Sequence, residues 1–93
     1  MIERVYVFCY DVSDRRRRGR IARRLEEAAV RVQRSVFEAP MAEKRADRLA
    51  RRLACDLGPG DSLKVYAIGK DGLTRCRAFG AALDVPRGDY LLV

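Results

Sequence analysis

The sequence has 93 residues and a net charge of +7, from 20 basic and 13 acidic side chains. This length allows only one domain, which we expect to span residues 1–93. A hydrophobic fraction of 48% excludes a disordered basic tail, and no apolar run approaches the ~20 residues that a membrane-spanning helix needs.

The composition also restricts the chemistry. The absence of histidine excludes Ser-His-Asp and Cys-His sites and the usual zinc sites, so any hydrolysis would depend on carboxylates and a hard metal ion. The cysteines (Cys9, Cys55 and Cys76) are odd in number and form no CxxC pair. Together with a start that lacks the layout of a secretory signal, they predict reduced thiols and a cytoplasmic protein.

The first half of the chain predicts a strand, a helix and an extended segment. Residues 2–10 are nearly all apolar, as in a strand buried on both faces. A helix is expected over about residues 14–29, with Ser13 or Asp14 as its N-cap. Residues 31–39 are expected to be extended, and their polar middle predicts a bulge or a tight turn between two short strands.

The second half predicts another helix followed by strands. Pro40 is expected to open a helix over about residues 41–57, because proline is favoured at the first helical position. Gly58, Gly60 and the proline between them would end this helix. The strands are expected at residues 62–68, 73–79 and 90–93, and the last of these pairs with its own sheet or with a partner subunit.

This order of elements predicts a ferredoxin-like α+β sandwich, in which an antiparallel sheet carries two helices on one face. Both faces of the first strand are apolar, so the face without helices must also be covered. Homodimerisation would cover it.

A carboxylate and a cluster of arginines follow the first strand. If Asp14 caps the helix, Asp11 is free for another role; the alternative is that Asp11 itself serves as a cap. The arginines occupy the first turns of the helix, where its dipole disfavours cations, and this placement is typical of a prepared anion site. The alternative is a cluster that is merely solvated. These arginines are Arg15, Arg16, Arg17, Arg18 and Arg20.

The second helix would add Lys44, Arg48 and Arg52 along one face. For one helix alone, a solvated face explains the pattern equally well. Two basic helices on the same side of a sheet indicate contact with a phosphate backbone and no reading of bases. The aromatic residues of the first strand are expected to pack in the core and not to stack on bases. Phe37 follows a polar segment and could take either role.

The segments 10–20 and 31–38, Tyr-Asp-Val-Ser-Asp with its arginines and Arg-Val-Gln-Arg-Ser-Val-Phe-Glu, closely resemble the CRISPR-associated protein two family, as does the strand that begins at Asp61. The resemblance implies a homodimer that binds a double-stranded DNA prespacer and bridges two dimers of the integrase, CRISPR-associated protein one. It also implies a magnesium-dependent endonuclease that acts on single-stranded RNA or on DNA. The last strand of the family often swaps onto the partner subunit.

The resemblance also implies site residues. Asp11 would hold Mg²⁺ together with its symmetry mate, and Arg18, Arg31 and Phe37 would take part in the activity. The residues expected to bind nucleic acid are Arg15, Arg16, Arg17, Arg18, Arg20, Arg34, Lys44, Arg48 and Arg52. Three functions therefore stay open: a DNA-bridging scaffold, a metal-dependent endonuclease, and a toxin-type ribonuclease or regulatory domain of related fold.

Overall fold

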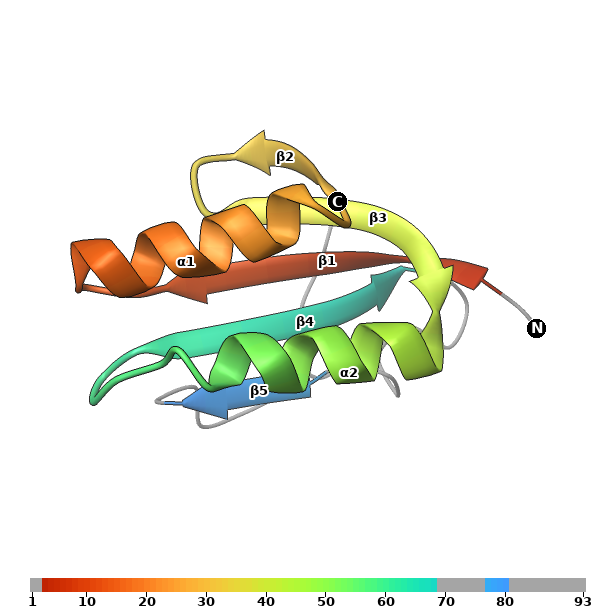
Figure 1. Ribbon diagram of the computed structural model, residues 1–93. Helices are drawn as coiled ribbons and strands as arrows, with labels where there is room; N and C mark the ends of the chain where they lie inside the picture. The colour runs from red at the N-terminus through yellow and green to blue at the C-terminus, as the bar shows by residue number, and fades with distance from the viewer. Residues whose placement is uncertain (1–2, 69–76, 81–93) are drawn as a thin grey trace.

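The computed structural model describes residues 3–68 and 77–80 and shows an antiparallel sheet with two helices on one of its faces (Figure 1). Along the sheet the strands are ordered β2-β3-β1-β4-β5. The first four strands and the two helices form the predicted ferredoxin-like α+β arrangement, and β5 extends the sheet beyond β4. The elements are β1 (Glu3–Asp11), α1 (Arg15–Glu26), β2 (Val30–Gln33), β3 (Val36–Ala42), α2 (Glu43–Ala54), β4 (Ser62–Ile68) and β5 (Arg77–Gly80).

The core lies between the sheet and the helices. The central strand β1 contributes Tyr6, Phe8 and Tyr10, which are all buried. Phe8 lies opposite Phe37 of β3 and Val65 of β4, so large apolar side chains from three adjacent strands share this face. The helices complete the core with Ile21 and Leu25 from α1 and with Ala46, Ala50 and Leu53 from α2.

The opposite face of the sheet carries neither of the two described helices. Val5, Val7 and Cys9 point to this side of β1, because side chains alternate along a strand. Val5 lies directly opposite Ile68 of β4, and the two side chains are 38% and 39% exposed. Within one copy of the chain this side of β1 is only partly buried, and its covering by a second copy stays a prediction. Val5, Val7, Cys9 and Ile68 form what we call the helix-free patch.

The start of the second helix differs from the prediction. Pro40 lies within β3, opposite Val5, and α2 begins only at Glu43. The strand can hold a proline here because its pairing with β2 ends at Glu38. At Pro40, β3 therefore has only β1 as a neighbour among the described strands and can lack one amide donor. The helix also ends earlier than predicted, at Ala54, and is followed by a turn in which the Leu57 amide donates to the Ala54 carbonyl.

The hairpin of β2 and β3 agrees with the prediction of two short strands. Their register shifts between Arg31 and Gln33, as in the predicted bulge. β5 covers the second part of the strand expected over residues 73–79. The turn at residues 71–72 and the C-terminal strand at 90–93, with its predicted swap, lie outside the described residues. No described helix has the length and apolar character required to cross a membrane.

Candidate nucleic-acid interface

A groove of about 560 Å³ opens at the end of β1, between α1 and the β2–β3 hairpin. It gathers three residues that the resemblance placed in the active site: Asp11, Arg18 and Arg31. Arg15 and Arg34 also line it, so its described lining combines one carboxylate with four guanidinium groups from two separate parts of the chain. The lining is completed by Tyr10, Val12, Gly19, Ala22 and Ser35. We call it the Asp11 groove.

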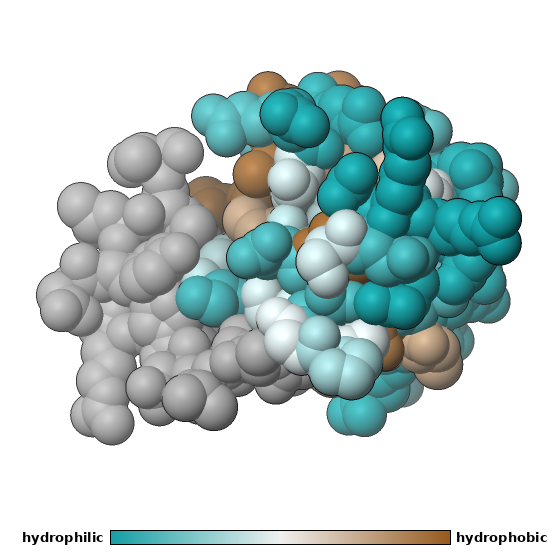
Figure 2. Space-filling view, turned by 90° about the vertical axis from the view of Figure 1, so that its left-hand side faces the viewer, coloured by the Kyte–Doolittle hydropathy of each residue, from teal (hydrophilic) through white to brown (hydrophobic). Residues whose placement is uncertain are grey.

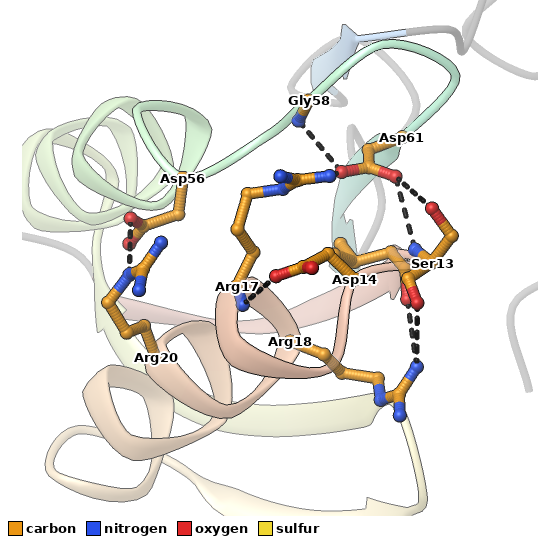
Figure 3. A network of polar contacts seen from close by, with 9 residues as sticks. Ser13, Asp14, Arg17, Arg18, Arg20, Asp56, Gly58 and Asp61 are labelled. Atoms are coloured by element: carbon orange, nitrogen blue, oxygen red, sulfur yellow. Dashed lines mark hydrogen bonds and ion pairs between the residues drawn. The ribbon is translucent and has the colours of Figure 1, made fainter.

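Arg18 is held in place by backbone carbonyls. Its Nη1 donates to the carbonyl oxygens of Val12 at 3.1 Å and Ser13 at 3.5 Å (Figure 3). These residues directly follow Asp11, so the guanidinium and the carboxylate are tied to the same short loop. Carbonyl oxygens fix the position of Arg18 without neutralising its charge, which leaves that charge for an anion in the groove.

The ring of Phe37 holds the side chain of Arg31 in position. Its guanidinium carbon lies 5.0 Å from the centroid of Phe37, a cation–π contact. The Phe37 ring is fully buried and stacks on Tyr10 with centroids 6.3 Å apart. A buried ring cannot touch a substrate, so Phe37 acts as a positioning residue for Arg31. The Tyr10 hydroxyl in turn donates to the carbonyl of Arg34 at 3.4 Å and ties the hairpin to β1.

The buried carboxylate of Asp61 organises the loop between β1 and α1. Oδ1 accepts hydrogen bonds from the amide and the hydroxyl of Ser13, at 3.1 and 3.4 Å. Oδ2 accepts from the Gly58 amide at 2.7 Å and from Nε of Arg17 at 3.4 Å. Figure 3 shows how Asp61 joins the loop before β4 to the start of α1. Sequence reasoning missed this role and assigned Asp61 only to a turn and to the following strand.

One signal for Asp61 is present in the sequence. Gly60 has a φ of 82°, which favours glycine, and its place after Pro59 marks a fixed turn. An aspartate that follows such a turn is well placed to accept backbone amides. The sequence does not indicate that one of those amides comes from Ser13, which is distant along the chain.

Hydrogen bonds lower the pKa of two aspartates here. The amides of Gly58 and Ser13, followed by the charge of Arg17, hold the pKa of Asp61 below its ordinary value. Asp14 is the N-cap of α1, as predicted, and its side chain accepts from the Arg17 amide at 2.9 Å. That bond, together with nearby arginine charge, lowers the pKa of Asp14. Both carboxylates therefore stay ionised beside the basic cluster.

The arginines of α1 fall into separate groups. Arg17 pairs with Asp61, and Nε of Arg20 pairs with Oδ1 of Asp56 at 3.0 Å, so these two charges are compensated within the chain. Arg15 and Arg18 line the Asp11 groove. Arg16 is exposed and lies outside it. Hydrophilic side chains cover most of the described surface at this end of the molecule (Figure 2).

The basic residues of α2 lie elsewhere. Arg48 and Arg52 line a second groove between the two helices. Lys44 is exposed in the first turn of α2 and is not part of either groove. The predicted nucleic-acid-binding set is therefore distributed over two surfaces.

Among the described residues, Asp11 is the only carboxylate that lines the Asp11 groove. Its side chain is exposed and forms no hydrogen bond or ion pair with the described residues. No group of three potential metal ligands occurs within residues 3–68 and 77–80. Mg²⁺ is usually held by one or two carboxylates together with several waters and substrate phosphates, so one Asp11 side chain supplies the minimum. The donor set fits the ion better if two copies of the chain bring their Asp11 side chains together.

The sequence matches the family described as CRISPR associated protein Cas2 over residues 4–76. A Synechocystis protein named CRISPR-associated endoribonuclease Cas2 2 is 37% identical over 90 residues, which cover 95% of this chain and 97% of the relative. A Thermus thermophilus protein named CRISPR-associated endonuclease Cas2 2 is 39% identical over 73% of this chain and 77% of its own length.

Solved structures agree in fold. A hypothetical protein from Thermus thermophilus has a TM-score of 0.67 and 36% identity, covering 73% of this chain and 84% of its own. A crystal structure described as cas2 has a TM-score of 0.63 at 23% identity and covers 98% of this chain and 95% of its own, which supports the fold alone. With the match to the family over most of its length and relatives above one third identity, the chain belongs to the CRISPR-associated protein Cas2 family.

Proposed function

We propose that the chain is a CRISPR-associated endonuclease subunit that cleaves nucleic-acid backbones in the Asp11 groove, with single-stranded RNA as the first substrate to test and DNA as the second. The observation that carries this proposal is the placement of one uncommitted carboxylate beside four arginines. Relatives named as an endoribonuclease and an endonuclease support the same class of activity.

The arginines would bind and orient the phosphate. Arg18 is already fixed by two carbonyls, and Arg31 by the ring of Phe37, so little side-chain entropy is lost when they bind an anion. Their charges would stabilise the negative charge that develops during phosphodiester cleavage. Bound Mg²⁺ would activate water and neutralise phosphate charge. The Asp11 carboxylates of two copies would hold that ion.

A homodimer through the helix-free patch would bring these two carboxylates to the same side. Asp11 has the same parity along β1 as Val5, Val7 and Cys9, so it lies at the end of this patch. Two-fold pairing places the same surface of each copy against the other. The exposed Val5 and Ile68 side chains supply apolar surface that such pairing would remove from water.

Cleavage assays with matched variants test the nuclease. Labelled single-stranded RNA and duplex DNA are incubated with the protein in Mg²⁺ or in EDTA, and the products are separated by size. We expect cleavage only with Mg²⁺, a loss of at least 100-fold in Asp11→Asn, and a reduction of 10-fold or more in Arg18→Gln. Arg23→Gln, an exposed change on the same helix outside the Asp11 groove, keeps wild-type activity. Equal rates for wild type and Asp11→Asn would remove the assignment.

The second candidate is a scaffold: a homodimer that binds double-stranded DNA and bridges dimers of CRISPR-associated protein one. The observation in its favour is the helix-free patch on one side of the sheet combined with basic helices on the other. Co-elution with CRISPR-associated protein one in size-exclusion chromatography tests it. We expect a complex that contains two copies of this chain, and Val5→Asp should prevent both dimer and complex. A complex formed equally well by a monomeric variant would contradict bridging.

A further inference from the structure

Asp61 and Arg18 bind the same peptide unit from opposite sides. Oδ1 of Asp61 accepts a hydrogen bond from the Ser13 amide at 3.1 Å, and Nη1 of Arg18 donates to the Val12 carbonyl, also at 3.1 Å. This amide and this carbonyl belong to one trans peptide bond, which is planar, so its N–H and C=O point in opposite directions. Figure 3 shows Asp61 and Arg18 on opposite sides of Ser13. The orientation of this peptide therefore links the buried carboxylate to a guanidinium of the Asp11 groove.

Asp61 is itself fixed by the turn between α2 and β4. It is only 1% exposed. Its second oxygen, Oδ2, accepts from the Gly58 amide at 2.7 Å and from Nε of Arg17 at 3.4 Å. A Cβ at position 58 would lie 2.5 Å from Nη2 of Arg17, so the glycine lets this guanidinium pack against the turn. The carboxylate is thus held on one side by the turn and can hold Ser13 on the other.

The short loop between β1 and α1 depends on this anchor. Asp11, the last residue of β1, pairs with Ser62 of β4, and Asp14 caps α1. Residues 12–13 lie between these two fixed points and belong to neither element. Without an acceptor for the Ser13 amide, the peptide between them would be free to rotate. Its carbonyl would then turn away from Arg18, whereas Asp11 would stay in the strand ladder.

We propose that Asp61 is a positioning residue of the Asp11 groove, which fixes the Val12–Ser13 peptide so that the Val12 carbonyl holds Arg18 in place for a phosphate. The hydrogen bond from the amide to a carboxylate also polarises the peptide and strengthens its carbonyl as an acceptor. This inference rests on the proposed function, because it concerns the binding of phosphate in the same groove. It gives Arg17 a different role from Arg18: Arg17 belongs to the anchor, and Arg18 binds the substrate.

A double-mutant cycle tests whether Asp61 acts through Arg18. We measure kcat/KM for the cleavage of labelled single-stranded RNA in Mg²⁺, for wild type, Asp61→Ala, Arg18→Gln and the double variant. Circular dichroism at the assay temperature shows whether each variant is folded. If Asp61→Ala is not, Asp61→Asn takes its place in the same cycle: its side chain has the same size, but its NH₂ group must face hydrogen-bond donors on one side.

Asp56→Asn is the matched control. Asp56 also follows α2 and also pairs with α1, through Nε of Arg20 at 3.0 Å and Nε of Arg24 at 3.4 Å. None of its described hydrogen bonds reaches residues 12–13. This change therefore weakens the contact between the same two parts of the chain and leaves the Val12–Ser13 peptide in place. It should keep the wild-type kcat.

We expect Asp61→Ala to lower kcat/KM by about 10-fold, because a small displacement of a group that binds the reacting phosphate is costly. In the Arg18→Gln background the same change should lower it by less than about 2-fold, because no guanidinium is left to be positioned. A purely structural role predicts equal losses in both backgrounds, and that result would overturn the proposal. An equal loss of kcat in Asp56→Asn would also overturn it.

Hydrogen exchange followed by NMR separates this inference from the nuclease. The Ser13 amide should exchange about 10-fold faster in Asp61→Ala than in wild type, because it loses a charged acceptor, and should stay protected in Asp56→Asn. A variant that exposes this amide yet cleaves like wild type would contradict the positioning role. If wild type cleaves nothing, the nuclease fails, and the same cycle is measured on the affinity for single-stranded RNA in EDTA. Coupling between Asp61 and Arg18 would then support the positioning role, and independent losses would overturn it.

Discussion

Phe37, which is buried in the core, positions the charged side chain of Arg31 at the surface. The Arg31 guanidinium lies over the Phe37 ring, and its nearest carboxylate contact, to Glu26, is long at 3.9 Å with both side chains largely exposed. An exposed ion pair of this length contributes little. The ring is therefore the main support of Arg31, and the part in the activity that the resemblance implies for Phe37 would be exerted through Arg31.

A double-mutant cycle tests this support. Phe37→Leu keeps an apolar side chain in the core and removes the ring face, and Arg31→Gln removes the cation. We expect the coupling free energy between the two changes, from urea unfolding, to be about 0.5–1 kcal/mol, the range for an exposed cation–π pair. Arg34→Gln, on the same hairpin, serves as the control partner and should show no coupling to Phe37. A coupling near zero for Arg31 would contradict the contact.

The lowered pKa of Asp61 predicts how the stability of the protein depends on pH. In the folded protein this pKa lies below the ordinary value of about 3.9, so ionised Asp61 favours the folded state. This contribution is complete above the unfolded pKa and is lost as the pH falls through the folded one. Asp61→Asn should therefore destabilise the protein at neutral pH, and the difference from wild type should narrow below about pH 4. Melting temperatures between neutral and acidic pH measure it; a difference that stays constant would exclude the carboxylate as its source.

At the scale of elements, local signals predicted most boundaries, and the exceptions have physical causes. The apolar runs of β1 and β4 and the cap at Asp14 follow from short-range pattern alone. Pro40 was expected to begin a helix, because proline suits that position. The structure places it in β3, at a position that the short β2 does not reach and where β1 is the only described neighbour. The length of β2 is set by tertiary pairing, which a local pattern does not contain.

The N-terminus of α2, which begins at Glu43, lacks a side-chain cap. Its N-cap is Ala42, which has extended backbone angles but no side chain that can accept a hydrogen bond. Ala42→Ser should supply that acceptor and stabilise the protein by about 1 kcal/mol, which raises the melting temperature of a domain of this size by about 4–8 °C. Ala54→Ser, in the last turn of the same helix, has no free amides to cap and should not stabilise. Differential scanning calorimetry distinguishes the two, and equal shifts would refute the capping argument.

At the scale of the whole molecule, the candidate site was predictable in part. Asp11 and the arginine cluster stand out from the residues alone, whereas Arg18 and Arg31 were singled out by the resemblance to the family; all three line one groove. The arginine run could not be resolved into its members from sequence, because the aspartates that pair with Arg17 and Arg20 lie about 40 residues away, after α2. The charge distribution thus depends on the contact between the loop that follows α2 and the start of α1. Among the described residues, the side chains of Arg48 and Arg52 in the groove between the helices have no ion pair, whereas three α1 arginines, Arg17, Arg20 and Arg24, form internal pairs.

The helix-free patch allows a prediction about the reactivity of Cys9. Cys9 lies in the helix-free patch, half-buried, and burial raises the pKa of its thiol, partly opposed by the charge of Lys64. Because only the thiolate is alkylated, Cys9 should react slowly with iodoacetamide, and more slowly still once a second copy covers the patch. Cys55 is exposed at the end of α2, far from this face, and provides an internal control within the same molecule.

Peptide mass spectrometry measures the labelling rate of each cysteine. We expect the rate constant of Cys9 to fall as the protein is concentrated from nanomolar to tens of micromolar, and the rate constant of Cys55 to stay the same. Val5→Asp places a charge opposite Ile68 in the patch and should remove the concentration dependence, because burying an unpaired carboxylate in the interface is costly. If Cys9 instead reacts at one rate throughout this range in wild type, the helix-free patch is not where two copies meet. The Asp11 carboxylates would then lack the pairing that a shared magnesium ion requires.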